Sequence, residues 1–377
     1  MLHLPLLAVI LAAMAIGVLA GLARIGWSVP SVGADRAGLH GPTLVAGVFG
    51  TLIALERAIA MRTVTSRPWT PADLAPILGG AGTLVLLVSG ATVPALVLLG
   101  AGAVGLLAIN LDMLRRHPTL DIATMAVGAV ILVLADVAWL AGRNVALLTP
   151  WWIAFLVLTI TGERVELARI RFGGPAGRAG FAVAVGLYVV TLLAVLADAS
   201  LGARLSGLGL LAITAWLLRH DVAWMTVRHP GFPRYAAICL LGGYVWLGVA
   251  GFILVASPGL WAGLTYDAFL HAVLLGFVFS MIFAHAPFIV PGIVGRRVGY
   301  HPLAWLPLLL LHVSVAARIA GDLLPDQDLR QAAGLLSAVA ILFYGLVLVI
   351  GLLRGPEPAR RSLSSPHPNQ RTPAGRR

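Results

Sequence analysis

Long apolar segments separated by short polar linkers dominate the chain. A helix needs about 20 apolar residues to cross the hydrocarbon core of a bilayer. Twelve segments reach that length, and the third and fourth are separated only by the very short turn "VSGATVP". We therefore predict an all-α polytopic membrane bundle of about twelve transmembrane helices. They run over residues 3–26, 38–61, 71–90, 92–114, 119–141, 148–169, 178–197, 200–219, 234–256, 266–290, 302–320 and 330–353.

The pattern also divides the chain into two parts. Residues 1–354 are predicted to form one twelve-span transmembrane domain. Residues 355–377, "GPEPARRSLSSPHPNQRTPAGRR", are rich in Pro, Ser and Arg and poor in large apolar side chains. Such a segment cannot bury enough apolar surface to fold, so we predict a disordered tail.

The composition supports a membrane protein. The chain is 59% hydrophobic and 11% charged, with a mean hydropathy of +0.96. A soluble domain is about one quarter charged. The net charge of +11 comes from arginine alone, since lysine is absent. The single cysteine, Cys239, allows no internal disulfide, and the absence of a C-x-x-C-H motif argues against covalently attached haem.

The arginines follow the topology of the spans. Loops after even-numbered segments hold most of them, such as Arg62, Arg115 and Arg296, whereas loops after odd-numbered segments carry acids such as Asp198 and Asp326. The positive-inside rule then places both termini in the cytoplasm of a bacterial-type inner membrane. The basic charge is thus explained by orientation in the lipid bilayer, and no nucleic-acid partner is expected.

Short sequence echoes indicate an internal repeat. "LERAIAMR" (55–62) resembles "GERVELAR" (162–169), and "LDMLRRHPTLDIA" (111–123) resembles "AWMTVRHPGFPRYA" (223–236). The offset of about 110 residues corresponds to four spans. The second and tenth spans also open alike, with "LHGPTLVAGVFG" and "LHAVLLGFVFS". We predict three pseudo-repeated four-helix units, with the second, sixth and tenth spans equivalent.

Two histidines occupy matching depths in this scheme. Ionisable residues inside spans are costly and are functional candidates by default. His40 and His271 lie near the outer ends of the second and tenth spans, where two neutral imidazoles could bind a haem iron from both sides. Alternatively, both hydrogen-bond to headgroups or carbonyls near the interface. Small residues would let a flat macrocycle approach the helices, namely Gly41, Gly47, Gly50 and Gly276.

His285 shares the tenth span with His271. In a regular α-helix, residues 14 apart project from one face about 21 Å apart, so paired haems on opposite sides of the membrane are conceivable. The second span, however, offers Glu56 and no histidine as an inner partner. Met281 could join His285 as a copper ligand, although packing is the more common role of such a methionine.

His312 and Arg318 lie in the eleventh span. His312 is either a ligand of a second metal or a hydrogen-bond partner, and the sequence does not separate these alternatives. Arg318 near the outer end could pair with haem propionates. It could also extend to the outer surface and pair with Asp322 four residues later.

Acidic residues inside the spans suggest other roles. Glu56–Arg57 and Glu163–Arg164 are interpreted as local ion pairs that anchor the inner helix ends, with proton entry as the alternative. Asp136 is expected to form a buried helix-to-helix hydrogen bond. These acids also allow a second functional hypothesis, a proton-coupled secondary transporter. Twelve-span transporters usually divide into halves of six, however, and the repeats here have four-span spacing. A third hypothesis is a non-catalytic assembly protein.

The segments with His40, His271 and His285, together with "HPLAWLPLLLLHVSVAARIAGD", resemble the NnrS family and, more distantly, subunit I of the haem–copper oxidases. The resemblance covers the membrane portion in topology and about three helices in motif. It implies an oxidase-like fold and a non-covalent b-type haem, with His40 and His271 as the axial pair and Arg318 as a propionate partner. His285 and His312 remain candidate metal and cofactor residues, and copper is possible.

Departures from these families limit the function that the resemblance implies. The sixth and seventh spans contain no histidine, so the usual copper site of the oxidases cannot form. Gly41 follows His40, where the NnrS family usually has an acidic residue. We therefore expect a haem-binding membrane protein in electron transfer or in the response to nitric oxide. Its partner would be a redox protein or a diatomic gas, and whether it is an enzyme stays open.

Overall fold

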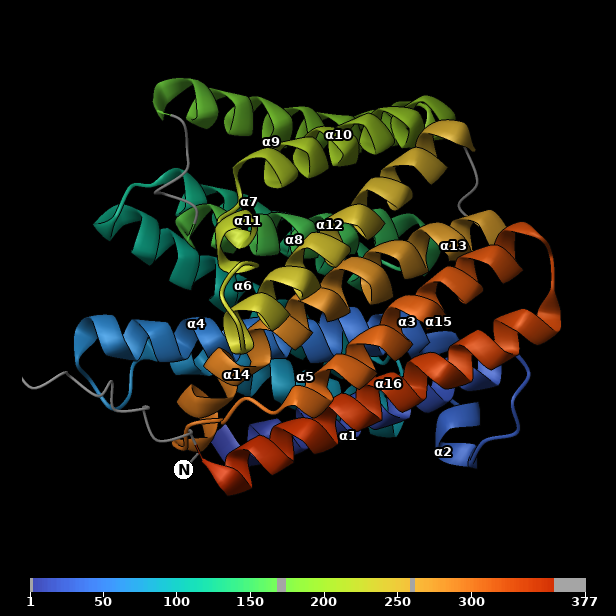
Figure 1. Cartoon of the computed structure of the whole chain (residues 1–377), viewed down its shortest axis with the longest axis horizontal. Helices are drawn as coiled ribbons and strands as arrows, with labels where there is room; N and C mark the ends of the chain where they lie inside the picture. Colours follow the sequence, from blue (N-terminus) through green and yellow to red (C-terminus); the bar gives the residue numbers. More distant parts are fainter. Residues whose placement is uncertain (1–2, 168–173, 258–261, 356–377) are drawn as a thin grey trace, which may run out of the picture.

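A computed structural model describes residues 3–167, 174–257 and 262–355 of the chain (Figure 1). Twelve helical segments within these ranges are long and apolar enough to cross a membrane, as predicted. The chain is thus a multi-pass helical membrane protein whose apolar helices contact the lipid bilayer. The tail predicted at 355–377 lies outside the described residues apart from Gly355.

Ten of the twelve spans consist of one main α-helix each. The third and eleventh of these twelve begin with a short 3₁₀ turn and cover Pro71–Ser89 and Pro302–Leu323. The helices are α1 (His3–Arg24), α5 (Leu74–Ser89), α6 (Val93–Arg116), α7 (Leu120–Leu140), α8 (Val145–Leu167), α9 (Gly174–Ala197), α10 (Ala199–His220), α12 (Phe232–Ala256), α15 (Trp305–Leu323) and α16 (Gln327–Arg354).

The second and tenth spans each contain a π-helix. The second span comprises η1 (Ala37–Leu39), α3 (His40–Pro42), the π-helix η2 (Thr43–Phe49) and α4 (Gly50–Thr65). The tenth comprises α13 (Leu264–His271), the π-helix η5 (Ala272–Phe279) and α14 (Ser280–Val294). Each π-helix begins within three residues after a histidine. π-Helical segments inside α-helices are rare and occur frequently at functional sites.

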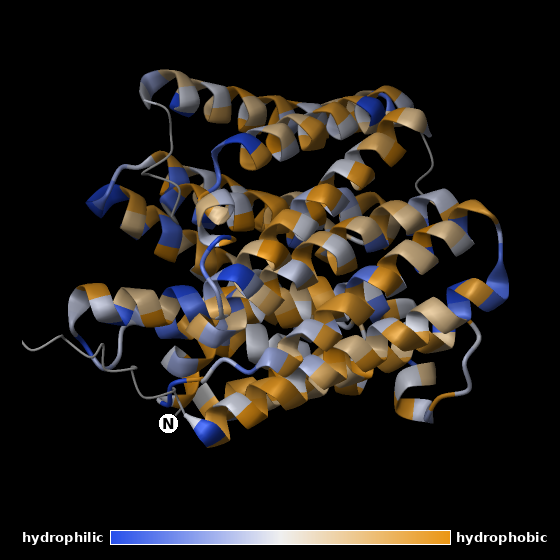
Figure 2. Ribbon diagram, in the orientation of Figure 1, coloured by the Kyte–Doolittle hydropathy of each residue, from blue (hydrophilic) through white to orange (hydrophobic). Residues whose placement is uncertain are grey.

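The second and sixth spans form the centre of the bundle. The apolar windows of Ala37–Thr65 and of α8 are 67% and 72% buried within the protein, whereas those of α1 and α16 are 22% and 28% buried. Helix α9 packs on α10, and α10 packs on α12, so α9 forms an outer layer at the top of Figure 1. Figure 2 shows that hydrophobic residues cover the helices while hydrophilic ones gather at their ends and inside the bundle.

The turn between α5 and α6 follows from two residues. Gly90 has a φ of 75°, a left-handed conformation that glycine adopts without steric cost. Pro94 lies in the first turn of α6, where its missing N–H leaves no intrahelical hydrogen bond unmade. The very short turn predicted here from "VSGATVP" is therefore confirmed.

The tenth span is longer than expected. We predicted its end at residue 290, but α14 continues to Val294 through Pro287 and Pro291. Transmembrane helices tolerate proline because neighbouring groups satisfy the carbonyls that lose their partner. Helix α1 begins and α16 ends at the same end of the bundle (Figure 1).

Candidate functional site

His40 is held against the first helix. Its Nδ1 lies 2.7 Å from the carbonyl oxygen of Gly17 in α1. Gly21, one turn further along α1, makes this approach possible, since a Cβ atom there would lie 2.5 Å from Cε1 of His40. The imidazole of the second span is thus fixed by the backbone of another helix.

His271 is held within its own helix. Its Nδ1 lies 2.8 Å from the carbonyl oxygen of Asp267, one turn earlier in α13. The side chain is 19% exposed. The spans that carry His40 and His271 are in contact, since the rings of Phe49 and Phe279 meet with centroids 5.8 Å apart. The structure therefore places the two predicted histidines on neighbouring spans.

These contacts determine which ring nitrogen is available on each histidine. A carbonyl oxygen only accepts hydrogen bonds, so Nδ1 carries the proton in both His40 and His271. In a neutral imidazole, Nε2 then keeps its lone pair. Among the described residues, no donor contacts either Nε2 atom. A hydrogen bond from the second ring nitrogen to a carbonyl is also the usual way that metal-bound histidines are oriented. Each of the two histidines therefore has an Nε2 lone pair that no described residue uses.

His285 lies at the opposite end of the same helix and has a different environment. Its Nδ1 contacts the carbonyl oxygen of Met281 at 2.8 Å, and its Nε2 accepts a hydrogen bond from Arg164 at 3.1 Å. Arg164 is 3% exposed and forms two hydrogen bonds with Asp221, at 2.9 and 3.1 Å. The lone pair that a metal would need is used by a guanidinium group. These contacts favour a structural role for His285.

The prediction that His271 and His285 share one face rested on a regular α-helix. The intervening residues Ala272–Phe279 form a π-helix instead. Each extra residue that a π-helix absorbs changes the relative orientation of the flanking residues by about 100°. The single-face geometry is therefore wrong.

His312 is a hydrogen-bond partner of Trp246. The indole Nε1 donates to His312 Nδ1 at 2.9 Å across α12 and α15, and the two rings are stacked. Because Nδ1 accepts, Nε2 carries the proton of the neutral ring and has no lone pair for a metal. Of the two alternatives left open by the sequence, this contact favours the hydrogen bond.

Arg318 belongs to a network of ion pairs close to His271. Its Nε donates to Asp322 at 3.2 Å, and its Nη2 pairs with Asp267. Arg330 in α16 binds the same two carboxylates, at 2.6 Å to Asp322 and 3.2 Å to Asp267. The pairing with Asp322 was predicted, but Arg318 is 4% exposed and does not extend to the surface. Its donors engage protein carboxylates, so nothing in this geometry reserves it for propionates.

Asp267 and Arg330 are site residues that the sequence argument missed. Asp267 lies four residues before His271 on the same helix, a spacing at which side chains meet, and this could have indicated it. Asp267, His271 and Asp322 offer ligand atoms within 4.8 Å of one another. The charges of the two carboxylates are balanced by Arg318 and Arg330, so this cluster is an ion-pair network rather than a cation site.

Two of the four glycines that were expected to let a macrocycle approach the helices lie against other side chains instead. A Cβ at Gly47 would lie 3.2 Å from Thr83, and one at Gly276 would lie 2.5 Å from Trp246. These two glycines permit close helix packing. A Cβ at Gly41, next to His40, would meet no atom within 4 Å. A Cβ at Gly50 would contact only the carbonyl oxygen of Val45, at 3.7 Å.

Two acidic residues inside the spans, Glu163 and Asp136, link neighbouring helices. Arg57 in α4 donates to Glu163 in α8 at 2.6 Å. The prediction of ion pairs local to one helix is therefore wrong, because this pair joins two helices. Asp136 in α7 accepts a hydrogen bond from Trp152 in α8 at 3.0 Å. The expected buried helix-to-helix hydrogen bond of Asp136 is confirmed.

The helices and the paired imidazoles define a multi-pass membrane protein with two candidate ligand histidines. The model of one protein family matches residues 3–352, and the chain belongs to this family, described as a domain of unknown function (DUF8744). No curated protein and no solved structure matches the chain.

Proposed function

We propose that this protein binds a b-type haem between His40 and His271. The observation that carries the proposal is that the two imidazoles have the same tautomer and the same kind of carbonyl contact. Each has Nδ1–H fixed by a main-chain carbonyl and an Nε2 lone pair without a protein donor among the described residues. They come from two different spans, the second and the tenth.

The role of the chain's residues would be to hold and orient the cofactor. A bound haem supplies one-electron redox chemistry or a binding place for a diatomic gas. Gly17 and Asp267 orient the two imidazoles through their carbonyl oxygens. The Asp267–Arg318–Arg330–Asp322 network fixes α13 against α15 and α16 beside His271.

The π-helices after His40 and His271 support the proposal that the second and tenth spans are equivalent. Their last aromatic residues, Phe49 and Phe279, also meet edge to face with ring centroids 5.8 Å apart. We extend the proposal to three four-helix units, an oxidase-like bundle and a relation to the NnrS family. The physiological role would then be electron transfer or a response to nitric oxide at a bacterial-type inner membrane, with both termini cytoplasmic. Copper is not included, because neither His285 nor His312 has a free nitrogen lone pair.

An absorption spectrum of the purified protein, oxidised and reduced, tests the proposal. Protein produced with ample haem should show a Soret band, and His40→Ala or His271→Ala should each abolish it. His285→Ala and His312→Ala are the matched controls and should keep the band. A colourless wild-type protein, or equal loss of the band in all four variants, would contradict the proposal. The transporter hypothesis predicts such colourless protein.

A further inference from the structure

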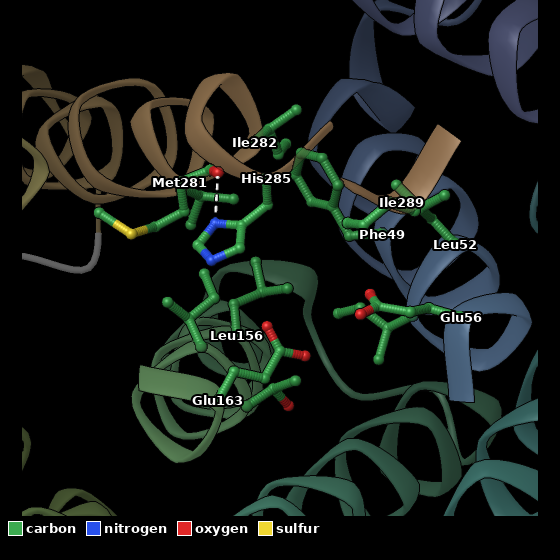
Figure 3. Close-up of a pocket in the computed structure, with 13 residues that line it drawn as sticks. Phe49, Leu52, Glu56, Leu156, Glu163, Met281, Ile282, His285 and Ile289 are labelled. Carbon is green, nitrogen blue, oxygen red and sulfur yellow. Dashed lines mark hydrogen bonds between the residues drawn. The ribbon is translucent and has the colours of Figure 1, made fainter. Parts of the chain in front are cut away.

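A cavity lies in the half of the bundle away from His40. It has a volume of about 60 Å³, is lined by η2, α4, α8, η5 and α14, and is partly open at one side (Figure 3). Its lining is apolar except for Glu56, Thr159, Glu163 and His285. One water molecule needs about 10–15 Å³ of such space, so the cavity has room for a few waters.

The ionisable groups of the cavity differ in their partners. Glu163 accepts a hydrogen bond from Arg57 at 2.6 Å, and His285 accepts one from Arg164 at 3.1 Å. Glu56 forms no hydrogen bond or ion pair with any residue that the structure describes. Figure 3 shows its carboxyl group pointing from α4 into the space that the Glu163 carboxyl group also faces.

The charges around the cavity balance without Glu56. Arg57 pairs with Glu163, and Arg164 pairs with Asp221. Glu166, one turn beyond Glu163, is exposed and adds only negative charge. A carboxylate on Glu56 would be a further anion that faces the anion of Glu163 in a partly buried apolar site. Such an uncompensated charge is costly, and a neutral carboxylic acid avoids the cost.

We propose that this cavity is a proton-binding site in which the Glu56 carboxyl group carries one exchangeable proton. Binding takes one proton from water to give the neutral acid, and release returns it. Water in the cavity would connect Glu56 with Glu163 and His285. The site lies sixteen residues after His40 in the same span and does not depend on haem.

Infrared spectroscopy of the purified protein in lipid at neutral pH tests this proposal. The wild type should show the C=O stretch of a protonated carboxyl group that shifts in D₂O. Glu56→Gln should lose a band equal to one carboxyl group per chain. Glu56→Asp should move the band. Glu163→Gln removes the facing anion and leaves Arg57 without its partner, so it should weaken the Glu56 band at neutral pH. Asp136→Asn serves as the control for another buried carboxyl group, which accepts a hydrogen bond from Trp152, and should leave the Glu56 band in place.

Three results would overturn the proposal. The first is a wild-type spectrum without a protonated carboxyl band, which needs no variant to fold. The second is a spectrum of Glu56→Gln that equals the wild type in this region. The third is loss of the wild-type band on addition of sodium chloride but not of choline chloride, because the site would then bind a metal cation. Glu56→Gln has the shape of the neutral acid, so its thermal unfolding midpoint should equal that of the wild type.

Discussion

The second and tenth spans carry a histidine-containing cluster at each end, and the two clusters use the imidazole in opposite ways. At one end, the Nε2 atoms of His40 and His271 face no protein donor among the described residues. At the other end, Nε2 of His285 is saturated by Arg164. All three rings have the same Nδ1 contact with a carbonyl oxygen. The difference lies in a single neighbouring guanidinium, which separates a candidate ligand from a structural residue.

Removal of the Arg164 guanidinium should have the largest effect on the free energy of unfolding. Arg164→Gln takes the positive charge from beside Asp221, whose carboxylate is fully buried. Loss of one partner of a buried ion pair costs about 3–5 kcal/mol. Denaturant unfolding in detergent should show this loss. Arg116→Gln, which breaks an exposed pair with Asp112, is the control and should change stability by less than about 1 kcal/mol. If Arg164→Gln and Arg116→Gln lowered the unfolding free energy equally, the contacts of Arg164 with Asp221 and His285 would not be stabilising the protein.

A smaller effect is expected from a methyl group placed beside His40. Gly21→Ala puts Cβ 2.5 Å from Cε1 of His40, so the ring must move. Such overpacking typically costs about 1–3 kcal/mol. Haem titration should show weaker binding, with the unfolding free energy lowered by this amount. Gly41→Ala, adjacent to His40 but facing open space, should bind haem like the wild type. If Gly21→Ala bound haem as tightly as the wild type, haem binding would not depend on the orientation of His40.

The smallest effect on the unfolding free energy is expected from a change midway along the spans, at Trp246. Trp246→Phe removes the hydrogen bond to His312 and should lower the unfolding free energy by about 1 kcal/mol. The Soret band should be retained, because His312 offers no lone pair to a metal in its present contact. Loss of the Soret band in Trp246→Phe would indicate that His312 also takes part in haem binding. The contrast between candidate ligand histidines and structural histidines would then no longer hold.

The sequence predicts the spans well because their signal is local. A run of apolar residues of sufficient length needs no knowledge of its neighbours, and the turn at Gly90 is marked by adjacent residues. The matching of His40 with His271 came from a short echo in the sequence. The π-helices were not predicted, since a continuous apolar segment contains no periodicity that separates i→i+4 from i→i+5 hydrogen bonding.

The partners of the site residues could not be predicted for a different reason. Arg164 and His285 are 121 positions apart, and Arg318 and Asp267 are 51 apart. Which guanidinium faces which imidazole or carboxylate depends on how the spans pack. Arg318 with Asp322 was predictable because four residues of one helix separate them.

The two π-helices also bear on how this family can vary in length. A π-helix holds an extra residue within a helix whose flanks keep their hydrogen bonding. Deletion of one residue within Thr43–Phe49 or Ala272–Phe279 would leave a shorter α-helix with the flanking side chains in nearly the same orientation. The same deletion elsewhere in these spans would rotate every later side chain by about 100°. In alignments of family members, gaps in the second and tenth spans should therefore fall in these two segments, just after the histidines.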